Sequence, residues 1–165
     1  MILMFARLHN VLIHVMAVLA AFILATIVTL ICADVVLRNM GLGNLPWAVE
    51  LSEYGLYAVT FLAAPWVLSM RAHVSMDLVL RVPNPNFRRI VQLLAYTFGL
   101  VICAILTWKG LDVVLTSKAR GSMVWKTFVF PEWWFLSLFP FAMFMLAVGF
   151  LRLQIEIMTD AQPAQ

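Results

Sequence analysis

The sequence predicts an all-α integral membrane protein, with four transmembrane helices in a single domain over residues 1–165. Of its 165 residues, 64% are hydrophobic and only 12% are charged. Soluble domains average about 45–50% apolar and about 25% charged residues. A chain of this size keeps much of its surface exposed, so a core cannot bury the excess of apolar side chains. Lipid is therefore the expected solvent for most of the protein.

Two uncharged runs of nineteen residues define the first and third predicted helices. Neither Val15–Ala33 nor Ile90–Trp108 contains a charged residue or a histidine. At about 1.5 Å per residue, each run extends for about 28 Å as a helix, close to the hydrocarbon thickness of a bilayer. We expect the first helix over residues 8–38 and the third over residues 88–115.

The second helix is predicted over residues 46–70, after a turn that contains glycine. Asn44 is a candidate cap for its start, and Pro46 suits its first turn. Pro65 lies inside the helix and lacks a backbone donor, so a kink is expected there. We expect the other three helices to be arranged around this one.

The fourth helix is predicted over residues 131–157. Trp133 and Trp134 lie near its start, where an aromatic belt would meet the membrane interface. Pro140 follows them within the helical segment, and its missing donor predicts a second kink.

Two polar connections join these helices in pairs. Within residues 72–89, a short helix over residues 74–82 is expected to lie in the membrane interface. Residues 116–132 mix basic and aromatic side chains, a composition that also favours the interface.

Four spans place both termini on one side of the membrane. Arginines that flank the connection between the second and third helices favour a cytoplasmic position for it, and therefore for both termini. These residues are Arg71, Arg81, Arg88 and Arg89.

The middle of each predicted helix lacks Asp, Glu, Lys, Arg and His, and its polar residues are hydroxyls such as Thr26, Thr29, Thr60 and Thr97. A proton relay, an ion path or a voltage sensor needs ionisable groups within the membrane. The chain is therefore not expected to carry a substrate through itself. No catalytic, cofactor-binding or metal-binding residue is expected, and the absence of a basic face argues against nucleic-acid binding.

The second helix carries two carboxylates near its start. Glu50 and Glu53 are three residues apart and so are neighbours on the helix surface. They either complement the positive end of the helix dipole at the interface or pair with a basic group on a partner protein. Acid–base catalysis by the pair is disfavoured, because nothing nearby suggests a nucleophile or a metal.

The opposite end of the second helix carries Arg71, His73 and Asp77. A charged cluster here can fix the geometry of the connection, and this role is favoured over pH sensing. An alternative is that His14 and His73 ligate a b-type haem at the membrane edge, as in the haem- or quinone-binding anchor subunits of respiratory complexes. A further alternative is a small self-assembling exporter, in which Glu50 would bind protons and drug.

Three short motifs carry a resemblance to a known family. They are Trp47-x-x-Glu50, Arg71-x-His73-Val74-x-x-Asp77 and Phe130-Pro131-x-Trp133, the last followed by Pro140. In their order and spacing the chain resembles the small, DctQ-type membrane subunit of tripartite ATP-independent periplasmic (TRAP) transporters. The resemblance covers essentially the whole chain. The family often has a glycine where Ala72 stands here.

The resemblance implies a non-enzymatic subunit in the bacterial inner membrane, with both termini in the cytoplasm. In this family a large membrane subunit carries the sodium and substrate sites, and a soluble periplasmic binding protein delivers an organic acid. The small subunit packs against the large one, contacts membrane lipid and holds no cofactor. Residues implied to be structural or subunit-contact positions are Trp47, Glu50, Glu53, Arg71, His73 and Asp77.

Overall fold

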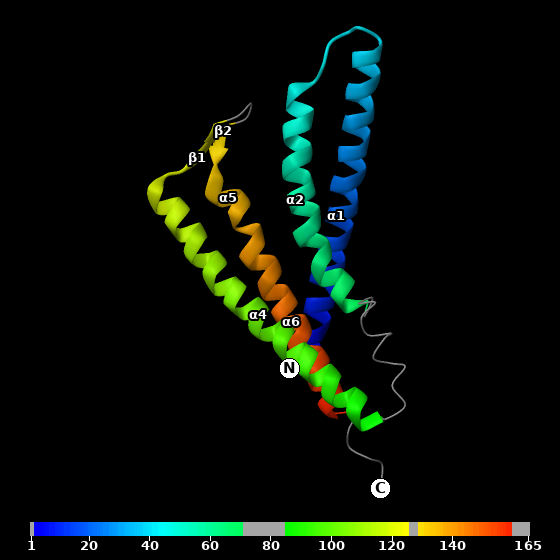
Figure 1. Ribbon diagram of the computed structural model, residues 1–165, viewed down its shortest axis with the longest axis vertical. Helices are drawn as coiled ribbons and strands as arrows, with labels where there is room; N and C mark the ends of the chain where they lie inside the picture. Colours follow the sequence, from blue (N-terminus) through cyan, green and yellow to red (C-terminus); the bar gives the residue numbers. More distant parts are fainter. Residues whose placement is uncertain (1, 71–84, 126–128, 160–165) are drawn as a thin grey trace.

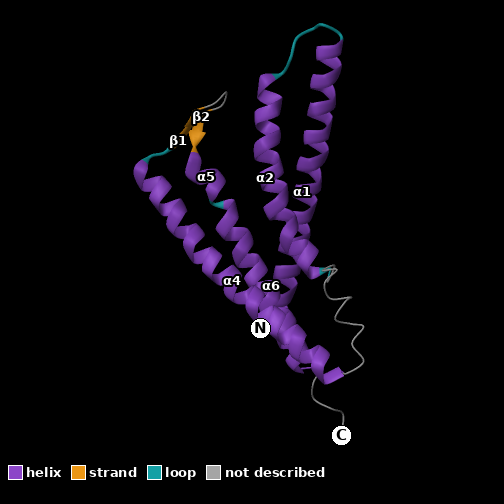
Figure 2. Cartoon of the chain, viewed as in Figure 1, coloured by secondary structure: helices purple, strands orange, loops and turns teal. Residues whose placement is uncertain are grey.

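The computed structural model describes residues 2–70, 85–125 and 129–159 (Figure 1). Its long helices are α1 (Ile2–Asn39), α2 (Pro46–Ser69), α4 (Pro85–Arg120) and α6 (Leu138–Thr159), and α5 (Glu132–Leu136) is a short helix before the last. The only strands in these residues are β1 (Met123–Trp125) and β2 (Val129–Pro131), which form an antiparallel hairpin (Figure 2). The predicted all-α class is confirmed.

Three described segments are long and apolar enough to cross a membrane: Arg7–Asn39, Arg89–Arg120 and Glu132–Thr159. The second helix, α2, is not among them. Its first half carries Glu50, Glu53 and two tyrosines, which lower the hydropathy of the segment. Three of the four predicted spans are therefore supported by length and composition, and the fourth stays a prediction.

The long helices lie side by side in an open row, in the order α1, α2, α6, α4 (Figure 1). The prediction that three helices surround the second is therefore wrong, because α2 packs extensively only on α1 and α6. At the two ends of the row, α1 and α4 make no extended contact with each other in the described chain. Over the described residues the row stays open, although α1 also reaches α6 near its start, where Met16 and Met145 are buried in one cluster.

The first hairpin is held by a line of contacts between α1 and α2. Met16 and Ala20 of α1 are buried against Leu62 of α2. Nearer the turn, a Cβ atom at Gly55 would lie 2.5 Å from Ile27 Cδ1, so a larger residue here would require the Ile27 side chain to shift. Gly55 contacts Ile27, whereas Leu62, which comes later in α2, contacts Met16 and Ala20, which come earlier in α1. The two helices are therefore antiparallel.

Glycines also mark the other two helix contacts. A Cβ atom at Gly110 of α4 would lie 2.8 Å from the Phe139 ring of α6, and one at Gly149 of α6 would lie 2.9 Å from Leu68 Cδ2 of α2. Leu68 is only 1% exposed. The helices α1 and α2 form a first helical hairpin, and α4 and α6 form a second. The contact between α2 and α6 therefore joins these two helical hairpins into one unit.

The helices run further than predicted at several ends. The first begins at Ile2 instead of residue 8, and the third continues to Arg120 instead of residue 115. Gly121, at φ +62°, ends the third helix in the left-handed conformation that glycine adopts readily. Residues 116–132 contain the end of α4 and the β1–β2 hairpin, and their expected position at the membrane interface stays a prediction.

The interruption predicted at Pro140 occurs at Ser137, between α5 and α6. A proline ring clashes with the carbonyl four residues earlier, here that of Leu136, and so disturbs the helix just before it. The backbone hydrogen bond from Phe141 N to Ser137 O is accordingly long, at 3.4 Å. Pro65 lies within the helix α2, which is continuous from Pro46 to Ser69, and the kink expected there stays a prediction.

Asp34 of α1, and not Asn44, holds the turn that leads into α2. The Asp34 carboxylate accepts a hydrogen bond from Leu45 N at 2.7 Å and pairs with Arg38 at 3.0 Å. The α2 helix has no side-chain cap of its own, so the prediction for Asn44 is wrong. The acceptor comes instead from the preceding helix, and Asp34 is only 7% exposed.

We expect Asp34→Ala to lower the free energy of unfolding of the detergent-solubilised protein by about 2 kcal/mol. The substitution removes the acceptor for Leu45 N, and a part-buried donor left without a partner costs about 1–3 kcal/mol. Loss of the pair with Arg38 adds little, because that side chain is 65% exposed. Asp34→Asn keeps an oxygen for Leu45 and should lose less. Equal melting temperatures for both variants and the parent would contradict this role.

Candidate subunit-contact site

Aromatic rings pack the first half of α2 against β2, α5 and the start of α6. The Tyr54 ring lies 5.2 Å from that of Phe130 on β2 and 4.9 Å from that of Phe135 on α5, while Tyr57 lies 4.7 Å from Phe135. The two Tyr54 pairs are edge-to-face, and aromatic pairs of this kind contribute about 0.5–1.5 kcal/mol each. Phe61 extends the contact along α2 to the first turn of α6. The polar start of α2 is therefore held in a defined orientation.

The base of the β1–β2 hairpin joins basic and aromatic side chains. Lys118 Nζ lies 5.2 Å above the ring of Trp133, and Ser117 Oγ donates to Glu132 Oε2 at 3.2 Å. A cation over a tryptophan face is attracted by the ring quadrupole. These contacts connect the end of α4 to α5, on the side where Tyr54 meets Phe130.

The two carboxylates of α2 occupy different environments. Glu50 is 6% exposed and therefore lies inside the chain, whereas Glu53 is exposed. Trp47, in the first turn, is half-buried. Of the three predicted positions in this segment, Glu53 is the one whose carboxylate is accessible to a partner. The contact role assigned to these residues stays a prediction.

The other predicted site residues, Arg71, His73 and Asp77, lie outside the described residues, as does the interfacial helix expected over residues 74–82. His14, the second histidine of the haem alternative, is exposed on α1, and its Nδ1 lies 2.8 Å from Asn10 O. No group of three or more His, Cys, Asp or Glu residues in the described segments could hold a metal ion.

The threonine hydroxyls at the middle of the helices donate within their own helices, and Thr97 Oγ1 also accepts a hydrogen bond from Gln154 Nε2 of α6 at 3.0 Å. Thr26, Thr29, Thr60 and Thr97 each donate to the carbonyl four residues earlier, at 2.8–2.9 Å. Such bonds satisfy the hydroxyl locally and remove its donor from any path across the membrane. These hydroxyls therefore present no free donor at the surface of the helices at this depth.

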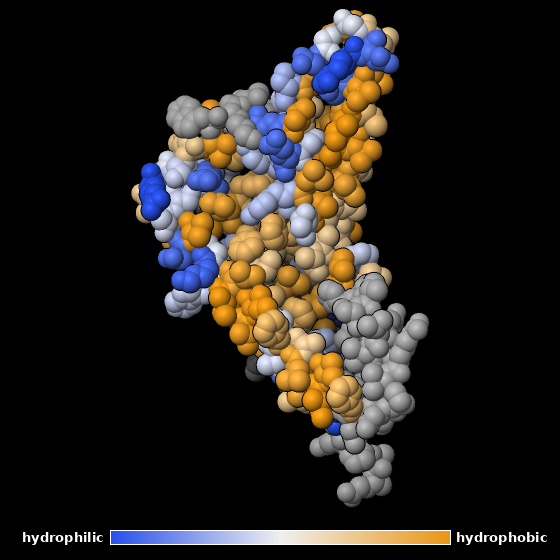
Figure 3. Space-filling view, viewed as in Figure 1, coloured by the Kyte–Doolittle hydropathy of each residue, from blue (hydrophilic) through white to orange (hydrophobic). Residues whose placement is uncertain are grey.

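Large apolar side chains cover the outer helices (Figure 3). On α1, Phe22 is 71% exposed, and on α4 Phe98 and Trp108 are 69% and 75% exposed. Soluble monomers rarely expose contiguous apolar patches above a few hundred Å². Hydrophilic residues gather instead around the α1–α2 turn and near the end of α4 (Figure 3). The faces of the row are thus suited to lipid or to another membrane protein.

An apolar groove of about 470 Å³ follows the contact between α1 and α2. The α1 side of the groove includes Ala17 and Ala21, and the α2 side includes Ala63 and Trp66. Small side chains on a membrane helix allow a neighbouring helix to approach closely. The groove could thus accommodate an apolar helix of another protein or a lipid chain.

Comparison with known proteins identifies the family. The model of the DctQ component of tripartite ATP-independent periplasmic transporters matches residues 27–159. No curated protein matches the sequence. The matched segment begins within α1 and ends with the last residue of α6, so it includes the aromatic contacts and both carboxylates of α2. Together with the apolar spans, the match shows a multi-pass membrane protein. The chain belongs to the DctQ family, the small membrane component of TRAP transporters.

Proposed function

We propose that the chain is the small permease subunit that supports the large transport subunit during ion-driven uptake of an organic acid. The observation that carries this proposal is the open row of helices with apolar broad faces. Over the described residues the row does not close on itself, because α1 and α4 at its two ends make no extended contact, and it therefore offers no enclosed pathway of its own. Sodium and substrate sites therefore belong to the partner.

The proposed assembly places the chain in the bacterial inner membrane, with a periplasmic binding protein that delivers the acid. The hydrogen bond from Arg152 Nη1 of α6 to Asn10 Oδ1 of α1, at 2.7 Å, brings the start of the first helix and the end of the last to the same end of the molecule. This contact supports termini on one side of the membrane. The arginines near the connection after α2 favour the cytoplasmic side.

Co-expression with the large subunit tests the proposal. We expect an affinity-tagged chain to retain the large subunit through size-exclusion chromatography, and liposomes to take up the acid only when both subunits and the binding protein are present. The same tagged chain expressed with an unrelated multi-span protein serves as the control. Substrate uptake by this chain alone would overturn the assignment, as would full uptake by the large subunit alone.

A further inference from the structure

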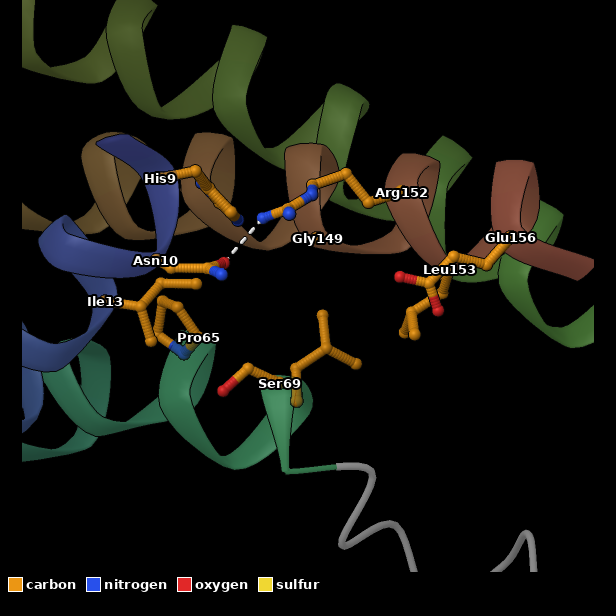
Figure 4. Close-up of a pocket in the computed structure, with 10 residues that line it drawn as sticks. His9, Asn10, Ile13, Pro65, Ser69, Gly149, Arg152, Leu153 and Glu156 are labelled. Carbon is orange, nitrogen blue, oxygen red and sulfur yellow. Dashed lines mark hydrogen bonds between the residues drawn. The ribbon is translucent and has the colours of Figure 1, made fainter. Parts of the chain in front are cut away.

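A polar cavity of about 210 Å³ lies where α1 begins and where α2 and α6 end (Figure 4). Aliphatic side chains such as Ile13, Leu68 and Leu153 form part of its wall. Its polar lining is unusual for a chain of this composition and comes from three helices. The polar residues are His9, Asn10, Ser69, Arg152 and Glu156.

The Arg152 guanidinium is held in place at this cavity. Its Nη1 donates to Asn10 Oδ1 at 2.7 Å, a contact that crosses from α6 to α1 (Figure 4). A guanidinium has five N–H donors in a rigid fork, so this one bond leaves donors for another group. The planar fork matches the oxygens of a phosphate, to which arginine binds in a bidentate manner.

His9 is the second observation that points to a ligand. The side chain is only 5% exposed, and it lines the cavity together with Arg152. The His9 ring lies beside the Arg152 guanidinium at the edge of the cavity (Figure 4). A neutral imidazole carries one N–H donor, so a His9 ring that lines the cavity suits an acceptor that enters it.

The position of the cavity suggests where that acceptor comes from. The uncharged run of α1 starts at Val15, six residues or about 1.7 turns after His9, so the cavity lies at the edge of the apolar zone. Phospholipid headgroups occupy this depth. The Glu156 carboxylate also borders the cavity, on the same helix as Arg152 and one turn further on. The lining thus presents a guanidinium, an imidazole and a carboxylate together.

We propose that this cavity binds the headgroup of an ethanolamine phospholipid. The phosphate accepts hydrogen bonds from Arg152 and His9, and the ammonium group lies toward Glu156. The aliphatic wall near Ile13 and Leu153 then faces the start of the acyl chains. The lipid bridges the first and last helices, at the place where Arg152 and Asn10 already connect them.

Native mass spectrometry of the purified complex tests the proposal with three probes: dioleoylphosphatidylethanolamine, dioleoylphosphatidylglycerol and inorganic phosphate. We expect the ethanolamine lipid to be retained in preference to the glycerol lipid. Arg152→Gln and His9→Phe should each weaken this retention by about tenfold, the effect of losing one charge-assisted hydrogen bond. Glu156→Gln should reduce the preference for ethanolamine.

The matched control is Arg89→Gln, which removes the same charge at the same end of the molecule. Arg89 donates to Ile157 O at 3.1 Å and does not line the cavity, so lipid retention should not change. If Arg152→Gln does not fold, Ser69→Trp fills the cavity from an exposed position without removing a charge, and it should lower retention equally.

Three results would overturn the proposal: equal retention of the two lipids, unchanged retention in both Arg152→Gln and Ser69→Trp, or displacement of the lipid by inorganic phosphate at equal concentration. The last result would identify a free-phosphate site. The readout is lipid mass bound to the protein, so it is independent of whether the transporter is active.

Discussion

Replacement of Glu50 with lysine is expected to lower the yield of folded chain by at least about tenfold. The Glu50 side chain is 6% exposed, at the start of α2 and one turn before the ring contacts of Tyr54. A lysine there would bury an ammonium group in surroundings that accommodate a carboxylate, and an uncompensated buried charge costs about 3–5 kcal/mol. Size-exclusion chromatography of the solubilised chain, expressed with and without its partner, measures the effect.

The matched control for this variant is Glu53→Lys, the same change three residues later. Glu53 is exposed, so the chain should fold normally and elute as the parent does. If Glu53 contacts the large subunit, as proposed, co-purification of that subunit and uptake fall while the fold persists. Normal yield, co-purification and uptake in both variants would remove the roles assigned to this pair.

Substitution of Gly110 by valine should push α4 away from α6 and lower the melting temperature of the chain. A Cβ atom at this position would lie 2.8 Å from the Phe139 ring and 3.1 Å from Pro140 Cβ. Neither neighbour can move aside easily, because one is an aromatic ring and the other a proline within a helix. Overpacking of this kind costs about 1–3 kcal/mol. Thermal unfolding in detergent, followed by circular dichroism, measures the loss.

Ala104→Val provides the comparison for Gly110→Val. Ala104 lies on the same helix, α4, but its side chain is exposed. The added methyl groups therefore meet lipid or detergent and should leave the melting temperature nearly unchanged. A similar melting temperature for the two variants would show that the α4–α6 contact does not depend on the missing side chain at Gly110.

The sequence was sufficient to locate the long helices, because an uncharged apolar run such as Val15–Ala33 is long enough to cross a bilayer and is uncommon in soluble proteins. The row arrangement could not be predicted in the same way. In a soluble protein an apolar stripe shows which face of a helix is buried. In lipid, exposed Phe22 is as apolar as buried Met16, so composition does not reveal which side of α1 meets α2.

The candidate site was predicted in part. The carboxylates of α2 were named, but the spacing that made them neighbours could not show that Glu50 is buried and Glu53 is not. The ring contacts were missed, although Tyr54, Tyr57 and Phe61 recur at intervals of three and four residues and so share a helix face. Asp34 was missed because a lone carboxylate near Arg38 at a helix end resembles a local ion pair, and its bond to Leu45 depends on the fold of the turn.

The open row of helices also has a mechanical consequence. In the described chain α4 packs extensively only on α5 and α6, and the α2–α6 contact at Gly149 and Leu68 joins this part of the row to the α1–α2 pair. Small rotations about successive helix contacts add up across the row. Such a sheet of helices can curve to follow the outline of whatever it lies against, while each helix keeps its own backbone unchanged.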